Sequence, residues 1–316
     1  MFVSPGTVAI LMATFNGERY LAEQIDSIIN QTYTDWVLFI RDDGSTDGTV
    51  NVIDRYCANY PDKIIRIVDS SEKHGSSANF ANLQQFVTNN YDFSLFMFAD
   101  QDDVWLTNKI ELSAKRIHEF NDNQPVLIHT DLKVVDKNLN ELDKSYVGYR
   151  ALRPDFKDIN HLLIQNNATG CTMMWNKPLN DIISDSLSID GIIQHDWWMS
   201  LVASGFGKIE FLSEPTILYR QHDRNEIGAT KVNSLNCIRK RFLGRKVLKE
   251  KLVKSVHQAE VFFSCYGSEL DQKNAEVVKA FSNLYNKGKI NRVLTIIRYG
   301  FYKQGLVQVI GELVLI

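Results

Sequence analysis

The chain has 316 residues, of which 44% are apolar and 23% are charged, and it contains 17 Gly, 6 Pro and 4 Cys. This composition excludes a collagen, a disordered tail and a small disulfide-stabilised scaffold. The length suffices for a substantial core and for two domains, or for one large domain with an appendage. Because the cysteines lack metal-binding spacing and a secretory context, we expect reduced thiols and a cytoplasmic protein.

The net charge of −3 conceals an uneven distribution along the chain. Residues 231–316 contain 16 Lys or Arg and 6 Asp or Glu, a net charge of +10, whereas residues 1–230 contain 19 and 32, a net charge of −13. Such asymmetry predicts a partner of opposite charge at one end of the protein. We expect no signal peptide, because no basic stretch precedes the first apolar run, and no membrane-spanning helix, because no run of 18 uncharged apolar residues exists.

Short apolar runs alternate with segments of helical periodicity over the first half of the chain. The apolar runs predict strands at residues 8–13, 36–40, 64–68, 93–99 and 126–135. Helices are predicted around residues 21–29, 50–57, 80–87 and 107–120, with Asp47 and Thr107 as N-caps. Repeated strand–helix–strand units predict an α/β fold with a mostly parallel sheet and helices on both faces.

The pattern changes twice further along the chain. Residues 160–222 indicate mixed strands and helices that complete a site, and the chain becomes helical and basic from about residue 231. We therefore place a domain boundary near residue 230, which gives a first domain of residues 1–230 and a helical C-terminal region of residues 231–316.

Polar residues follow three of the predicted strands directly. They are Thr14-Phe15-Asn16, Asp42-Asp43 and the segment from Asp100 to Asp103. Ligands bind at the carboxyl ends of the strands in an open parallel sheet. Ordinary turn chemistry would explain any one of these clusters, but it explains three on one sheet edge poorly.

The segment Asp100-Gln101-Asp102-Asp103 is the most informative of the three. Its three carboxylates repel one another unless a cation lies among them. Mg²⁺ and Mn²⁺ take hard oxygen ligands and bind carboxylates together with substrate phosphates. A solvated acidic loop is the alternative, but Val104-Trp105 places a bulky aromatic residue directly after the acids. We therefore predict a divalent metal site here.

Taken in order, these segments resemble the family 2 glycosyltransferases with the GT-A fold. The matching stretches are VAILMATFNG at residues 8–17, RDDGSTDGT at 41–49 and FADQDDVW at 98–105. The resemblance covers roughly residues 5–230. The motif ADQDDVW, with TGCTMM at 169–174 and YRQH at 219–222, most resembles bacterial rhamnosyltransferases of surface polysaccharide assembly.

The resemblance implies a nucleotide-binding half at about residues 1–105 and an acceptor half at about residues 106–230. It implies that the pyrimidine base of the donor is held by Asp43 and by the loop of Ala13, Thr14, Phe15 and Asn16. The donor sugar would be lined by residues of several loops, namely His74, Gly75, Asn79, Asn167 and Gly170.

The resemblance also implies a Mn²⁺ or Mg²⁺ ion bound by Asp102, Asp103 and His222, with Asp102 facing the ribose and Asp100 supporting the pair. Such an ion neutralises charge on the departing nucleoside diphosphate. A lone His is otherwise more often structural. Arg220 and Arg224 are candidate phosphate partners, because a guanidinium binds phosphate oxygens bidentately; a solvated loop is the alternative.

The general base implied by the family is the Asp of His195-Asp196-Trp197-Trp198, at the start of a predicted helix. A carboxylate there can accept the proton of the acceptor hydroxyl while that oxygen attacks the anomeric carbon. Without the resemblance, a helix cap is the simpler interpretation of Asp196. Trp197 and Trp198 line the acceptor site or pack in the core.

The region after residue 231 combines basic and apolar residues, and residues 292–316 are very apolar but are interrupted by Arg298, Lys303 and Glu312. One interpretation is peripheral attachment to the anionic inner face of the plasma membrane, which would suit a lipid-linked acceptor. A helical appendage packed on the first domain, or a homodimer contact, is the other. No nucleic-acid partner is expected, because no nucleic-acid-binding module is recognised.

The resemblance thus implies an inverting, metal-dependent glycosyltransferase. The leading expectation is transfer of L-rhamnose from dTDP-rhamnose to a hydroxyl of a growing, lipid-linked cell-surface polysaccharide, with a UDP-hexose donor as the alternative. A non-catalytic sugar-nucleotide or glycan-binding module is disfavoured by the intact set of Asp43, Asp102, Asp103 and Asp196. A nucleotidyltransferase needs a Gly-rich, basic loop after the first strand, and residues 13–19 contain one Gly and one Arg.

Overall fold

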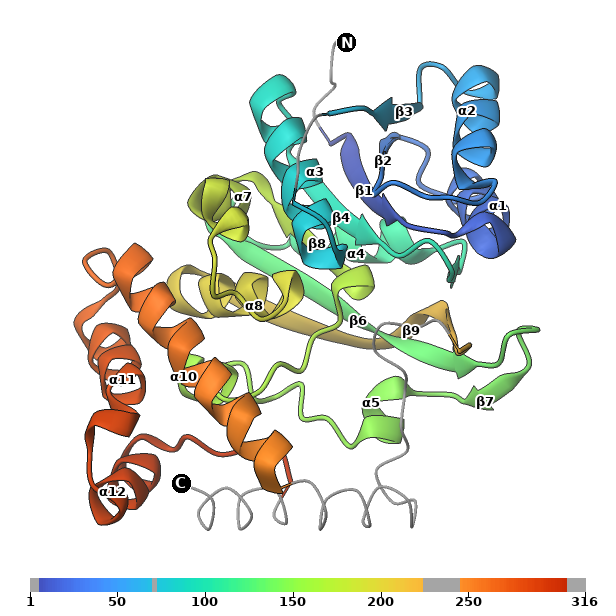
Figure 1. The fold of residues 1–316 in the computed structure, drawn as a ribbon. Helices are drawn as coiled ribbons and strands as arrows, with labels where there is room; N and C mark the ends of the chain where they lie inside the picture. The colour runs from blue at the N-terminus through green and yellow to red at the C-terminus, as the bar shows by residue number, and fades with distance from the viewer. Residues whose placement is uncertain (1–5, 70–72, 224–244, 306–316) are drawn as a thin grey trace. The chain divides into compact units, whose positions relative to one another are not determined.

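The computed structural model describes residues 6–69, 73–223 and 245–305 (Figure 1). The chain divides into two compact units. Unit 1 comprises Met1–Ser145, Thr169–Ser188 and Gly207–Gly228, and unit 2 comprises Tyr146–Ala168, Ile189–Phe206 and Ala229–Ile316. Unit 2 therefore takes two segments from the middle of the chain, and the boundary near residue 230 stays a prediction.

Unit 1 contains the sheet. The described strands have the order β3-β2-β1-β4-β8-β6-β9-β5, and β7 pairs with β6. Their bounds are β1 Val8–Thr14, β2 Trp36–Asp42, β3 Ile64–Ile67, β4 Leu95–Ala99, β5 Val104–Trp105, β6 Val126–Val135, β7 Glu141–Asp143, β8 Met173–Asn176 and β9 Lys208–Arg220. The five strands predicted from apolar runs are confirmed, with ends that differ by up to two residues.

The parallel part of the sheet lies where the sequence alternates strand and helix. β3, β2, β1 and β4 are parallel to one another, and β6 is parallel to β9. Strand β8 enters antiparallel between β4 and β6, and the short strands β5 and β7 are also antiparallel to their partners. The predicted α/β class is confirmed, with the antiparallel strands added in the second half of the sheet.

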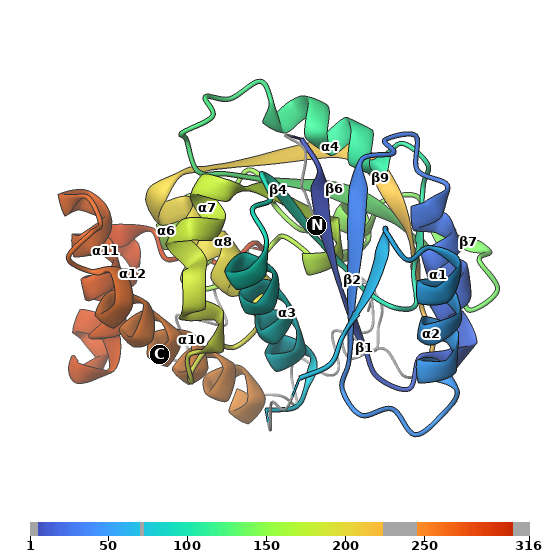
Figure 2. The ribbon, with the colours of Figure 1, turned by 90° about the horizontal axis from the view of Figure 1, so that it is seen from above.

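Five helices of the described residues accompany this sheet: α1 Glu18–Ile29, α2 Thr49–Asn59, α3 Ser76–Asn90, α4 Lys109–Ile117 and α7 Lys177–Ile183. Figure 2 shows α3 on one side of β1 and β2 and the pair of α1 and α2 on the other. The apolar face predicted for α1 is fully buried at Leu21, Ile25 and Ile28. This packing on both faces explains why β1 and β4 are apolar along almost their whole length.

The two predicted N-caps have different outcomes. The Asp47 carboxylate accepts a hydrogen bond from the first helical N–H of α2, at Thr49 (3.0 Å), although Gly48 occupies the N-cap position. The prediction for Thr107 is wrong, because Asn108 is the N-cap of α4. The Thr107 carbonyl instead accepts a hydrogen bond from the N–H of Thr32 (2.9 Å), which ties the segment before α4 to the end of α1.

The described part of unit 2 is helical. Its helices are α5 Tyr146–Arg150, α6 Ile159–Leu162, α8 His195–Phe206, α10 Arg245–Tyr266, α11 Gln272–Ser282 and α12 Lys289–Tyr299. Trp198 of α8 is fully buried and packs edge-on against Phe262 of α10 (5.4 Å between ring centroids), so it belongs to the core of this unit. No helix in the described ranges is both long and apolar enough to span a bilayer.

Candidate active site

The carboxyl ends of three strands meet at one edge of the sheet. In the register of the sheet, Thr14 of β1 pairs with Asp42 of β2, and Met12 of β1 pairs with Ala99 of β4. The three polar clusters that follow these strands therefore lie along one edge, as the sequence predicts. This edge is where an open parallel sheet binds ligands.

The loops after β1 and β4 are joined by a reciprocal pair of hydrogen bonds. The N–H of Phe15 donates to Oε1 of Gln101, and Nε2 of Gln101 donates to the carbonyl of Phe15, both at 2.9 Å. A Cβ at Gly17 would lie 2.1 Å from Oε1 of Gln101, so a larger residue would separate the two loops. Phe15 itself is 54% exposed, so its ring is available to a ligand at this edge.

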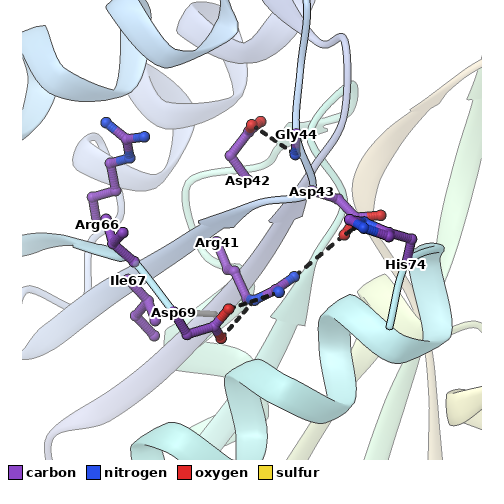
Figure 3. A pocket seen from close by; sticks show the side chains of 9 residues that line it. Arg41, Asp42, Asp43, Gly44, Arg66, Ile67, Asp69 and His74 are labelled. Atoms are coloured by element: carbon purple, nitrogen blue, oxygen red, sulfur yellow. Dashed lines mark hydrogen bonds and ion pairs between the residues drawn. The ribbon is translucent and has the colours of Figure 1, made fainter. Parts of the chain in front are cut away.

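A buried arginine organises the end of β2 (Figure 3). Arg41, 4% exposed, donates through Nε and Nη2 to the two oxygens of Asp69, both at 2.8 Å. Its Nη1 donates to Oδ1 of Asn79 on α3 (3.1 Å), and the Asn79 amide donates back to the carbonyl of Arg41 (3.1 Å). The Asp69 carboxylate raises the pKa of Arg41 through its hydrogen bonds and its negative charge. The guanidinium is therefore permanently charged.

Asp43 lies at the mouth of the same pocket of about 230 Å³, whose wall includes Arg41, Arg66, Val68 and His74. One oxygen of Asp43 accepts a hydrogen bond from the N–H of Gly75 (2.7 Å), and the other lies 3.0 Å from Nδ1 of His74. These donors on two sides hold the side chain, which is 8% exposed, in one orientation.

Asp102 and His222 come together at the end of β4 and the end of β9. Nε2 of His222 lies 2.8 Å from Oδ2 of Asp102, and the side chains are 11% and 17% exposed respectively. The imidazole stacks on the ring of Tyr20, with 4.9 Å between centroids. One carboxylate oxygen and one imidazole nitrogen, both near the surface, are ligand types that bind divalent transition metals.

Arg220 binds the acidic loop of Asp100 to Asp103 through two of its residues. Its Nε donates to the carbonyl of Asp102 (2.8 Å), and its backbone N–H donates to Oδ1 of Asp103 (3.1 Å). Nη1 donates to the carbonyl of Lys137 (2.9 Å), and Nη2 forms an ion pair with Glu23. The guanidinium, 2% exposed, thus binds protein groups on each of its nitrogens, and the phosphate contact stays a prediction. Arg224 lies outside the described residues.

Asp103 points to the interior and is fully buried. A carboxylate oxygen of Asp103, one of Asp100 and the sulfur of Cys171 lie within 4.8 Å of one another. Burial, reinforced by the charges of Asp102 and Asp100, holds the pKa of Asp103 well above its ordinary range. Cys171, in the short 3₁₀ helix Gly170–Thr172, has its pKa raised by the same burial and by both carboxylates.

A buried lysine faces this inner group. Lys109, the first residue of α4, is fully buried, and its Nζ has no hydrogen-bond acceptor among the described residues. The ammonium group lies 4.7 Å from the ring centroid of Trp105. Burial lowers the pKa of Lys109 to about 8, and attraction from Cys171 and Asp103 limits this decrease. The interior behind the acidic loop therefore already contains one cation.

Lys109 and Asp69 are site residues that were not predicted from the sequence. A lysine before an apolar helical face resembles an ordinary surface lysine. The one indication in the sequence that Lys109 could be buried is Trp105, four positions earlier, whose ring can bind a cation. Asp69 follows β3, and a charged Arg41 inside an apolar strand is the sign that a carboxylate must lie nearby.

Of the remaining predicted residues, Ala13, Asn16 and Gly170 belong to unit 1, whereas Asn167, His195 and Asp196 belong to unit 2. Asp196 lies in the first turn of α8 with 9% exposure, and its carbonyl accepts a hydrogen bond from the Ser200 hydroxyl (3.0 Å). His195 beside it is half-buried with both ring nitrogens in the interior, and this desolvation lowers its pKa to about 3 and keeps the ring neutral. The Asn167 amide donates to the carbonyls of Arg153 and Phe156, at 2.7 and 3.1 Å.

The family model of glycosyl transferase family 2 matches residues 9–183, more than half of the chain. The chain belongs to glycosyl transferase family 2. It is 31% identical over 257 residues to the dTDP-rhamnosyl transferase RfbG of Shigella flexneri, an alignment that covers 75% of this chain and 82% of that protein. It is 26% identical to an uncharacterized glycosyltransferase of Nostoc sp., covering 69% of this chain and 66% of that protein. The protein is a glycosyltransferase that uses a nucleotide sugar.

A solved structure shows the same fold. TarS of S. aureus, residues 1–349 in complex with UDP-GlcNAc, superposes with a TM-score of 0.52 at 15% sequence identity, covering 93% of this chain and 88% of that one. The expected GT-A fold is thereby confirmed.

Proposed function

We propose that the protein is an inverting rhamnosyltransferase, which transfers L-rhamnose from dTDP-rhamnose to a hydroxyl of a growing surface polysaccharide. The observation that carries the donor assignment is the 31% identity to the dTDP-rhamnosyl transferase RfbG over three quarters of this chain. A UDP-hexose donor is the second candidate. The intact set of Asp43, Asp102, Asp103 and Asp196 supports catalysis over a passive binding module.

The pocket beside Asp43 suits a pyrimidine base. Oδ2 of Asp43 accepts from the N–H of Gly75 and keeps a second lone pair, which can accept from the N3–H of thymine or uracil. Arg41 supports this wall by fixing Asp69 and Asn79. Phe15, exposed in the loop of Ala13 to Asn16, offers a ring face for stacking.

Asp102 and His222 fit a divalent ion. Their donor set of one carboxylate and one imidazole favours Mn²⁺ over Mg²⁺, which prefers oxygen ligands, and leaves other positions for phosphate oxygens. When bound, the ion would neutralise charge on the departing diphosphate. Asp103 as a direct ligand stays a prediction; its full burial beside Lys109 supports the alternative that it fixes the loop from the interior.

Asp196 is the proposed general base of the transfer. The acceptor oxygen forms a bond to the anomeric carbon while the bond from that carbon to the phosphate oxygen breaks, and dTDP leaves with the electron pair. The hydroxyl proton passes to the carboxylate of Asp196. A single displacement inverts the anomeric configuration and needs no nucleophile from the protein. The resemblance to the family supports this role, and the carboxylate lies in the first turn of α8 with 9% exposure.

We propose a lipid-linked acceptor and a peripheral contact with the inner face of the plasma membrane through residues 231–316, whose net charge is +10. The donor can be tested without this acceptor, because water replaces the acceptor hydroxyl in slow hydrolysis of the nucleotide sugar.

The experiment that tests this proposal is a donor panel. dTDP-rhamnose, dTDP-glucose, UDP-glucose, UDP-GlcNAc and GDP-mannose are incubated with the protein and Mn²⁺, and release of nucleoside diphosphate is measured. We expect the highest kcat/KM with dTDP-rhamnose. A higher value with a UDP-hexose would establish the second candidate, and thermal stabilisation without any release would indicate a binding module.

A further inference from the structure

Helix α12, Lys289–Tyr299, carries a row of exposed apolar side chains. Ile290, Leu294 and Ile297 are 78%, 57% and 53% exposed. They are spaced at i, i+4 and i+7, so they lie on one face of the helix. The buried residues Thr295 and Ile296 lie on the opposite face, where the helix packs in unit 2.

This row is a patch rather than a scatter of single residues. Among the helices whose side chains are all described, none besides α12 has three exposed large apolar side chains. Isolated exposed apolar residues are common and need no explanation, whereas a contiguous patch marks a surface that binds something apolar.

Basic residues border the row on both sides. At 100° per residue, Lys289 and Arg298 lie on either side of the face formed by Ile290, Leu294 and Ile297. Both are exposed, and Arg298, at 74%, has a single distant carboxylate in Glu276 of α11 (3.9 Å).

Acidic residues are absent from the stretch of sequence that contains α12. Residues 277–311 contain six Lys or Arg and no Asp or Glu. A protein partner with a complementary face would need both an apolar row and acidic rims. An anionic bilayer surface presents both features at every position, with apolar chains below a layer of negative headgroups.

We propose that α12 lies in the surface of an anionic membrane, with Ile290, Leu294 and Ile297 inserted below the headgroups and Lys289 and Arg298 at the level of the phosphates. The inference deepens the membrane contact of the proposed function by assigning it to one helix. It does not depend on the identity of the donor.

The test is sedimentation of the full chain with sucrose-loaded vesicles of phosphatidylglycerol and phosphatidylcholine, or of phosphatidylcholine alone. We expect binding to the anionic vesicles that weakens in 0.5 M NaCl. The triple variant Ile290→Ser, Leu294→Ser, Ile297→Ser should lower the partition coefficient by at least about 10-fold, because it removes most of the inserted apolar area. Lys289→Gln with Arg298→Gln should lower it by about 5-fold per charge.

Matched controls carry the same chemical changes on unit 1. Leu142→Ser replaces a leucine of 52% exposure, and Lys115→Gln with Lys208→Gln removes two exposed charges. We expect both controls to bind like the wild type. Thermal melting confirms that each variant is folded, which is expected because the changed side chains are exposed.

Three results would overturn the inference. One is a wild-type chain that stays in the supernatant with anionic vesicles, and another is equal binding by the triple variant. The third is a dimer in light scattering that the triple variant converts to a monomer without altering vesicle binding, which would assign the row to a second copy of the chain. Nucleoside diphosphate release in the same samples reports on the proposed transferase separately, so the two failures are distinguishable.

Discussion

Replacing Lys109 by Met should alter the pH dependence of stability in a defined direction. The ammonium group is fully buried, and burial lowers its pKa from 10.5 to about 8. Below pH 8 the folded and unfolded chains both hold this proton. Between pH 8 and 10.5 the unfolded chain keeps the proton while the folded chain releases it, so the free energy of unfolding rises with pH.

The size of this effect follows from the pKa values. At about 1.4 kcal/mol per pH unit, the decrease from 10.5 to about 8 corresponds to about 3 kcal/mol, gained by the folded state as pH rises through this window. Methionine has a similar length and no charge, so the gain disappears in Lys109→Met. Cys171 acts in the opposite direction, since its raised pKa lowers stability as the unfolded thiol ionises. The difference between the two proteins therefore reports Lys109 together with its electrostatic coupling to Cys171 and Asp103.

The assay is urea unfolding followed by tryptophan fluorescence at pH 7 to 10. We expect the free energy of unfolding of the wild type to rise relative to Lys109→Met by about 2 to 3 kcal/mol over this range. Lys115→Met, on the exposed side of the same helix, is the matched control and should remain parallel to the wild type. Parallel curves for the wild type and Lys109→Met would refute the assignment of a charged, buried ammonium behind the acidic loop.

Three further predictions concern the site itself. Asp196→Asn should lower kcat for transfer by about 10²- to 10⁴-fold while leaving the thermal stabilisation by dTDP intact, and unchanged turnover would remove Asp196 from the mechanism. Arg41→Met should lower the free energy of unfolding by about 2 kcal/mol in urea titrations, because the half-buried carboxylate of Asp69 loses the partner of its ion pair; an unchanged value would contradict the structural role of the pair. His222→Gln should weaken Mn²⁺ binding in calorimetry by about 10-fold or more, with an unchanged affinity arguing against a metal role.

The parts of the fold set by local pattern are those that the sequence predicts. Strands β1, β2 and β4 are continuous apolar runs because helices cover both faces of the sheet, and such runs are visible without any partner. Strand β8 inserts antiparallel between β4 and β6, and its place depends on partners about 45 to 80 residues away in the sequence. Pairing over such distances leaves no local periodicity that would place β8 beside them.

The site shows the same division. The motif of Asp100 to Asp103 predicts mutual repulsion of three carboxylates. The buried cation near them, Lys109, is placed by the turn between β5 and α4, which the motif does not predict. Asp102 and His222 are 120 positions apart, and the resemblance rather than the spacing placed them together. The predicted phosphate contact of Arg220 stays a prediction, and the bonds of its guanidinium to Asp102, Lys137 and Glu23 could not be read from the local sequence.

Calorimetric titration of dTDP tests most directly whether the strand-end carboxylates hold a nucleoside diphosphate through a divalent ion. The titration is made with the wild type in Mn²⁺, with the wild type in EDTA, and with Asp102→Asn in Mn²⁺; Asp122→Asn, an exposed acid of the same unit, is the control. The account predicts binding to the wild type and the control in Mn²⁺, and an affinity at least about 10-fold lower in EDTA and in Asp102→Asn. Equal affinity under all four conditions would contradict it.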